Sequence, residues 1–156
     1  MRAIELNPKM TLAYSYRGIA KAILGYSNGA INDTNKAIDL DPKNALPYSY
    51  RGMVKTTLGD SKGAIQDCNK AIVLDPNDAL LYMNRCIVRS TMDDNTDAIQ
   101  DATKAINLNP NISKAYIYRG VAKSKNSDSS SAIQDFSQAI RTVPERFAGL
   151  FFQGIS

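Results

Sequence analysis

The sequence predicts an all-α solenoid of antiparallel helix pairs, and its clearest sign is a repeat of 34 residues. Five of the six prolines follow this period: Pro8, Pro42, Pro76, Pro110 and Pro144. A fixed period in this range is typical of stacked supersecondary units, in which each unit covers the apolar face of its neighbour. Each unit also holds two segments of helix-forming composition with a break between them, so the repeating element is a helical hairpin.

Four further columns of residues keep the same step. A tyrosine, an arginine, an alanine and an aspartate each return in four successive units: Tyr14, Tyr48, Tyr82 and Tyr116; Arg17, Arg51, Arg85 and Arg119; Ala30, Ala64, Ala98 and Ala132; Asp33, Asp67, Asp101 and Asp135. Chance does not align so many columns. The repeat therefore extends along the whole chain.

The first full unit shows where its two helices begin and end. Residues 11–24 contain no proline and stop at Gly25, which supplies the backbone freedom of a helix C-cap. Residues 28–40 are rich in alanine and isoleucine and stop before Pro42, because the residue before a proline is disfavoured in helical geometry. Pro47 lies outside the period but falls at the start of a helix, where its missing N–H has no acceptor to lose.

Together, these features resemble the tetratricopeptide repeat: 34 residues, two helices, an aromatic and then a small residue in the first helix, alanine and Ala-Ile in the second, and a closing proline. The resemblance implies a right-handed superhelical solenoid. It covers four full repeats, at 11–44, 45–78, 79–112 and 113–146. Residues 1–10 would be the end of a preceding repeat, its second helix, and residues 147–156 the start of a further repeat or a C-terminal cap helix.

The resemblance also implies where the two helices of a repeat come closest. Small residues of the first helix would face the alanine column of the second, at Gly18, Gly52, Cys86 and Gly120. Only small side chains would let the two backbones approach at these positions.

Composition favours a soluble, folded and non-catalytic protein. Of the 156 residues, 44% are hydrophobic and 22% charged, the balance of a globular chain. Histidine is absent, which removes the commonest general base and metal ligand, so we expect no enzyme activity, no cofactor and no metal. Cys68 and Cys86 show no metal or redox spacing and are expected to be buried free thiols. No apolar run is long enough to span a bilayer, and we expect a cytoplasmic location with no membrane contact.

The arginine and aspartate columns lie on antiparallel helices of the same hairpin, so we predict an Arg–Asp pair in every repeat. The arginines share a helix face with Tyr14 and Gly18, the face that packs on the second helix. A structural role is therefore favoured over ligand contact. Such a pair fixes the register of the hairpin more than it adds net stability, because desolvation offsets much of the attraction.

A second stripe on each first helix would line the concave groove of the resembling fold. On residues 11–24 this stripe consists of Leu12, Tyr16, Ile19 and Ile23. These residues are spaced by three or four positions and lie opposite the packing face. The candidate partner-binding residues are Leu12, Tyr16, Ile19, Leu46, Tyr50, Met53, Leu80, Met83, Asn84, Ile87, Lys114, Ile117, Tyr118 and Val121. The alternative is that neighbouring repeats bury this stripe.

The best-known ligand of the family is a peptide carboxylate held by a clamp of lysine, arginine and asparagine. Asn84 and Lys114 fall on two clamp positions, whereas Ser49, Met53 and Tyr118 occupy the others, so this function is not supported. The apolar stripe instead suggests a protein or peptide partner, bound either extended or helical. Tyrosine offers rigid contact area with a polar tip, and methionine adapts to irregular partners.

Other functions rank below a protein-binding scaffold. The runner-up is self-association end to end, because Phe147, Leu150, Phe151 and Phe152 would leave an apolar terminal helix uncapped. The formal net charge of +4 comes from lysines and arginines spread along the chain. A strip of Lys36, Lys70 and Lys104 is best explained as a solvated face, and we expect no nucleic-acid binding.

Overall fold

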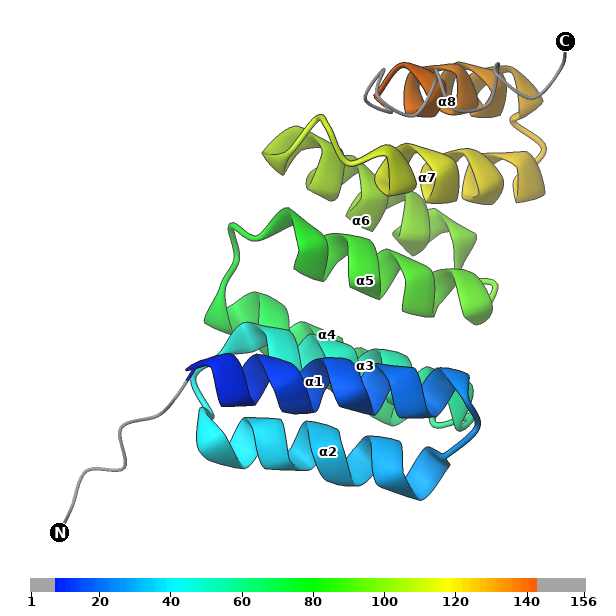
Figure 1. The fold of residues 1–156 in the computed structure, drawn as a ribbon. Coiled ribbons are helices and arrows are strands. Elements are labelled where there is room, and N and C mark those ends of the chain that lie inside the picture. Colours follow the sequence, from blue (N-terminus) through cyan, green and yellow to red (C-terminus); the bar gives the residue numbers. More distant parts are fainter. Residues whose placement is uncertain (1–7, 143–156) are drawn as a thin grey trace, which may run out of the picture.

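The computed structural model describes residues 8–142, and this part of the chain is entirely helical apart from turns (Figure 1). The helices are α1 (Pro8–Ile23), α2 (Ser27–Leu40), α3 (Ala45–Thr57), α4 (Ser61–Leu74), α5 (Ala79–Thr91), α6 (Asn95–Leu108), α7 (Ser113–Lys125) and α8 (Ser129–Thr142). The predicted all-α repeat architecture is confirmed. The predicted helix at 147–156 and the first seven residues lie outside the described part.

The helix bounds agree with the sequence prediction except at one end. α1 begins at Pro8 instead of residue 11, so Pro8 starts a first helix instead of only closing a preceding one. Proline suits the first turn of a helix because its fixed φ is already helical and no intrahelical N–H bond is lost there. Pro47 likewise lies in the first turn of α3 and is buried.

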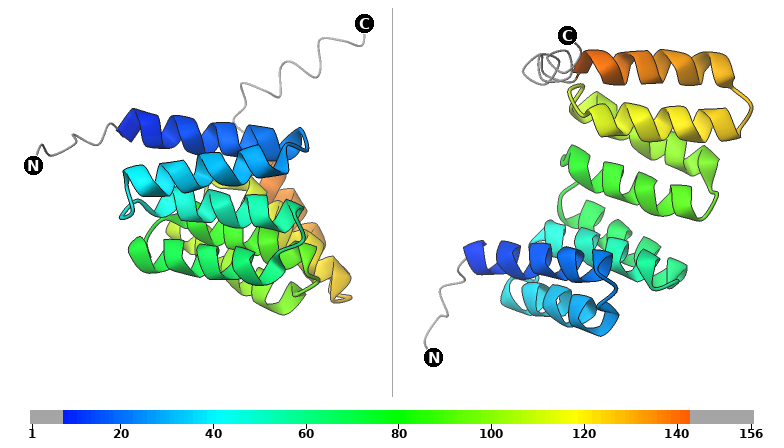
Figure 2. Two further views of the ribbon diagram at one scale, coloured as in Figure 1. Left: turned by 90° about the horizontal axis from the view of Figure 1, so that it is seen from below. Right: turned by 45° about the vertical axis from the view of Figure 1, so that its right-hand side comes forward.

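The helices form antiparallel pairs that stack into two layers (Figures 1 and 2). Each first helix (α1, α3, α5, α7) packs on the second helix of its own pair and on the second helix of the pair before it, where one is described. Consecutive first helices also touch, whereas consecutive second helices in residues 8–142 do not. The first helices therefore form the inner layer of a curved stack, and α1/α2 and α7/α8 lie at its opposite ends.

The two helices of each pair approach closely at the predicted column of small residues. A Cβ placed on Gly18 would lie 3.1 Å from the carbonyl oxygen of Ala30, and one on Gly52 would lie 2.9 Å from that of Ala64. Both acceptor atoms belong to the backbone and cannot move aside easily. At Gly120 the ring of Phe136 fills the same space, and a Cβ added to this glycine would lie 2.8 Å from the ring.

The predicted Arg–Asp pairs are present in all four repeats. Each arginine donates from Nε and Nη2 to the two carboxylate oxygens of the aspartate sixteen residues later, with distances of 2.6 to 2.9 Å. The aspartates Asp33, Asp67, Asp101 and Asp135 are 3% to 5% exposed. A two-bond pair of this geometry fixes the relative position of the two helices.

A second cation binds each of these aspartates. It comes from the first helix, one turn after the arginine, at 2.7 to 2.8 Å: Lys21, Lys55, Arg89 and Lys123. Each buried carboxylate is thus matched by two cations, which offsets the free energy lost on removing it from water.

The arginines also join neighbouring repeats. Nη1 of Arg51 donates to Oδ1 of Asn35 at 2.8 Å, and Nη1 of Arg85 donates to Asn69 at 2.7 Å. In the last described repeat, Nη1 of Arg119 donates to the hydroxyl of Thr103 at 3.2 Å. One guanidinium therefore binds both the second helix of its own repeat and the second helix of the repeat before it.

These bonds lower the pKa of three of the aspartates, Asp33, Asp67 and Asp135. The hydrogen bond from Arg17 lowers the pKa of Asp33 to about 2, with Lys21 assisting and burial opposing. At Asp67, burial raises the pKa, but the bonds from Arg51 and Lys55 outweigh it, so the net pKa is lowered. A carboxyl with a lowered pKa in the folded state stabilises the protein above its unfolded pKa, and this stability is lost as pH falls toward the folded pKa.

The turn after each first helix uses a left-handed backbone conformation at one position. This position is Gly25 (φ 81°), Gly59 (φ 79°), Asp93 (φ 55°) and Ser127 (φ 65°). Glycine adopts this conformation without a steric penalty, whereas a residue with a Cβ atom does not.

We therefore expect Ser127→Gly to stabilise the protein. The substitution removes the steric strain of a Cβ atom at positive φ, and we expect a gain of about 1 kcal/mol in the free energy of unfolding, measured by urea denaturation. The reverse change in the first half of the stack, Gly59→Ser, is the matched control and should lose a similar amount. If both substitutions raised the free energy of unfolding, or both lowered it, this explanation would be wrong.

The ion pairs predict a loss of stability in acid. Between about pH 5 and pH 2 the melting temperature should fall as Asp33, Asp67 and Asp135 take up protons, because the folded pKa of each lies below the unfolded value of about 3.9. Asp67→Asn should lower stability at pH 7 by about 2 kcal/mol, since Arg51 and Lys55 lose their charged acceptor, and should make this pH dependence shallower.

The control for this prediction is Asp39→Asn, which removes the same charge from an exposed position on α2. Thermal melts of both variants across the acid range give the comparison. If the two pH profiles are the same, the buried pairs do not cause the acid sensitivity.

Candidate binding groove

The inner face of the stack carries the residues that the sequence predicted to bind a partner, and several are open to solvent. Tyr16 is 57% exposed, Ile117 43% and Val121 38%, and Lys114 is also exposed. Seven others are half-buried: Leu12, Ile19, Leu46, Met53, Leu80, Ile87 and Tyr118. The first helices therefore present partly exposed apolar side chains along the whole described stack.

Three of the predicted residues are buried and need correction as surface contacts. Tyr50, Met83 and Asn84 are 7%, 6% and 2% exposed. Consecutive first helices contact each other directly, so side chains near this junction are covered by the next repeat. Burial also raises the pKa of Tyr50, and the neighbouring Tyr16 adds to this effect. At these positions the alternative considered for the sequence, burial by neighbouring repeats, describes the structure.

Asn84 has a structural partner across the junction of two repeats. Its Nδ2 donates to the hydroxyl of Ser49 at 3.0 Å, and both residues are buried. A carboxylate could reach Asn84 only if this bond broke and α3 and α5 separated. Of the two clamp positions that the sequence retains, only Lys114 is exposed.

An apolar hollow on the inner face lies between α1 and α3. Ile19, Ile23 and Met53 line a hollow of about 110 Å³, together with Ala22, Val54 and Thr57. Ile23 is 79% exposed, the most exposed of the large apolar side chains described. Next to this hollow, the rings of Tyr16 and Tyr50 pack with their centroids 5.6 Å apart.

The set of candidate residues omitted part of this hollow. Of the residues that line it, Ala22, Val54 and Thr57 lie outside the predicted stripe. Thr57 stands one repeat length after Ile23, so the 34-residue step itself was a signal for its position. The hollow forms between two first helices, so the apolar stripe of a single helix does not predict it.

The two cysteine thiols of the chain are buried in the stack. Cys68 and Cys86 are free and fully buried, and burial raises their pKa to about 12 and about 11, respectively, so both thiols are unreactive. In residues 8–142 no group of three or more potential metal-ligating side chains comes together. No helix among them combines the length and apolar character needed to cross a bilayer.

Comparison with known proteins supports the repeat assignment. A family model for the tetratricopeptide repeat matches residues 50–78, within the second predicted repeat. A search of curated proteins found no match in sequence.

Solved structures resemble the fold over most of its length. The crystal structure of MamA aligns with a TM-score of 0.72 at 23% identity, over 91% of this chain and 83% of that one. PilF of Pseudomonas aeruginosa aligns with a TM-score of 0.78 at 21% identity, over 86% of this chain and 62% of that one. The second tetratricopeptide-repeat domain of Spaghetti (RPAP3), bound to the HSP90 peptide SRMEEVD, gives 0.61 at 29%, over 64% and 92%.

The helix pairs, the 34-residue columns and these likenesses define a helical repeat solenoid. Residues 50–78 match a tetratricopeptide repeat, and the described part of the chain has the tetratricopeptide-repeat fold.

Proposed function

We propose that the chain is a non-catalytic scaffold that binds a peptide or helical segment of a partner protein on its inner face. The observation that carries the proposal is the row of partly exposed apolar side chains on the first helices, with its hollow at Ile19, Ile23 and Met53. An apolar side chain of the partner would enter this hollow, while Tyr16 would cover its backbone. The affinity would come from apolar burial, at roughly 25 cal/mol per Å², less the entropy lost on ordering the peptide.

The proposed ligand differs in chemistry from the peptide bound by the RPAP3 domain. That peptide, SRMEEVD, is acidic at its carboxyl end. In this chain the asparagine that would face such a carboxylate is bonded to Ser49 and buried. We therefore propose micromolar binding of an apolar peptide with little dependence on salt, since few charges would be neutralised.

A second candidate function is self-association of the stack end to end. The support for it is the exposed apolar surface of α8, where Ile133 is 65% and Ile140 75% exposed. The apolar residues 147, 150, 151 and 152, on which the sequence prediction of this function rested, lie outside the described residues.

The groove proposal is tested with peptides selected from a phage-displayed random library against the immobilised chain. We expect the selected peptides to be apolar and to bind at micromolar concentration by calorimetric titration. Ile23→Asp should weaken binding by about tenfold or more, because it puts a charge into the apolar hollow, and Tyr16→Ala and Met53→Ala should weaken it less.

The matched control is Val73→Asp on α4. Val73 is 76% exposed, close to Ile23, but lies on a second helix away from the inner face. Equal affinity of the Ile23 and Val73 variants would reject the apolar groove. Tight binding of the SRMEEVD peptide that weakens steeply with salt and is lost in Lys114→Ala would show a carboxylate clamp instead.

A further inference from the structure

The two ends of the described stack carry matching halves of the junction that joins the repeats. The junction between α6 and α7 serves as the reference. On α7, Ala115 and Ala122 are buried, at 0% and 1% exposure, in clusters that include residues of α6. α1 carries alanines in the same two columns, Ala13 and Ala20, and both are exposed.

α8 repeats the surface of α6 that receives α7. On α6, Ile99 packs in the cluster of Ala122, and Ile106 is 8% exposed in the cluster of Ala115. One repeat later these residues are Ile133 and Ile140, which are 65% and 75% exposed. α8 thus presents two isoleucines in the arrangement that α6 uses to bind a first helix.

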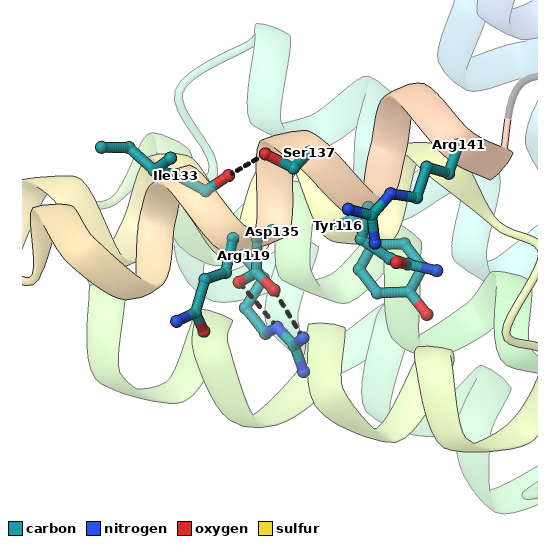
Figure 3. A pocket seen from close by; sticks show the side chains of 8 residues that line it. Tyr116, Arg119, Ile133, Asp135, Ser137 and Arg141 are labelled. Carbon is teal, nitrogen blue, oxygen red and sulfur yellow. Dashed lines mark hydrogen bonds and ion pairs between the residues drawn. The ribbon is translucent and has the colours of Figure 1, made fainter.

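The hydrogen bond between Arg119 and Thr103 at the α6–α7 junction also has counterparts of its acceptor and donor at the two ends of the described stack. The hydroxyl of Thr103 donates to the carbonyl of Ile99 at 2.7 Å and accepts from Arg119. One repeat later, Ser137 donates to the carbonyl of Ile133 at 2.8 Å, as Figure 3 shows, and its oxygen can still accept a bond. Ser137 and Ile133 line a hollow of about 520 Å³ beside the Arg119–Asp135 pair (Figure 3).

The donor for this acceptor is present at the other end. Arg17 holds Asp33 through Nε and Nη2, which leaves Nη1 as the nitrogen that its counterparts direct to the preceding repeat. The side chain of Arg17 is 58% exposed, whereas that of Arg119 is 17% exposed.

We propose that α1 of one copy of the chain docks on α8 of a second copy, so that the stack continues from molecule to molecule. Ala13 and Ala20 would pack on the two isoleucines of α8, and Arg17 would donate to Ser137. The contact specifies the end-to-end association considered above and does not depend on peptide binding. It joins two different surfaces, so a pair of molecules keeps one free surface of each kind and the association can propagate.

The inner face supports the same register. Ser49 and Asn84, which bond across an interior junction, occupy the columns of Ile117 and Tyr16. These two residues are 43% and 57% exposed, and the proposed contact would bring them together.

The columns favour a second copy over the chain's own following segment. At the positions one repeat after Ala115, Arg119 and Ala122, the sequence has Gly149, Gln153 and Ser156. That segment would offer α8 neither the arginine nor the apolar methyl groups. α1, in contrast, has alanine, arginine and alanine in the three columns.

The test is sedimentation equilibrium of the full chain and of variants at each end. Ala20→Arg blocks the α1 surface and Ile140→Asp blocks the α8 surface, and both positions are exposed, so the fold is retained. The wild type should gain mass with concentration beyond the 17.1 kDa of one chain, whereas each variant alone should remain at that mass. A mixture of equal amounts of the two variants should reach twice that mass and stop, because each has one intact surface.

Several outcomes would overturn the proposal. They are a wild type that stays at the mass of one chain, a mixture that gains no mass, and association of Ala20→Arg alone, which would mean α8 pairing with α8. If a chain ending at Thr142 associates and the full chain does not, the following segment covers α8. The exposed control Val73→Asp should associate like the wild type, and its failure to do so would show a charge effect without a specific site.

Discussion

The guanidinium groups of the arginine column are the interaction on which the architecture depends. Each interior arginine binds an aspartate of its own repeat with two nitrogens and a side chain of the preceding repeat with the third, as Arg51 does with Asp67 and Asn35. A single planar group therefore fixes both the angle within a hairpin and the step between hairpins. Arginine suits this task because its donors are held in a rigid fork that a lysine does not have.

The buried Arg–Asp column does not prevent apolar packing, because the apolar side chains pack at other positions of each repeat. The closest helix approach is reserved for glycine, cysteine and alanine, and the larger apolar side chains lie at the junctions between repeats, as Leu81 and Val88 do. The same division shapes the inner face. Side chains that the next repeat covers, such as Tyr50, are used for stacking, whereas others, such as Ile23, stay exposed on the inner face.

Most of the fold could be predicted from the sequence because it is encoded in spacing. The 34-residue step placed the helix pairs, and the step of sixteen from Arg51 to Asp67 placed a cation opposite a carboxylate on antiparallel helices. The second cation, such as Lys55, was not predicted as part of this pair, since its role appears only when the helices are seen to cross there.

The binding face could be predicted only in part. Helical periodicity identifies the inner stripe but not the rotation between successive repeats, which decides whether a residue such as Tyr50 is covered. Tyr16 and Tyr50 occupy equivalent columns and yet differ from 57% to 7% exposed, because only one of them lies on a first helix flanked by another on each side. The exposed fraction of a side chain therefore depends on the position of its repeat in the stack, and the column alone does not determine it.

The repetition of the Arg–Asp–Asn column has a consequence for folding. Because each junction joins the arginine column to an asparagine or threonine of the preceding repeat, a hairpin that docks one whole repeat out of place would form similar bonds. Correct assembly must then be decided by residues that break the repetition, such as Leu81, whose column holds alanine or proline in the other repeats, and Cys86, whose column holds glycine. Consensus substitutions that make the repeats more alike would remove this discrimination and favour misassembled stacks, even where each single change stabilises its own hairpin.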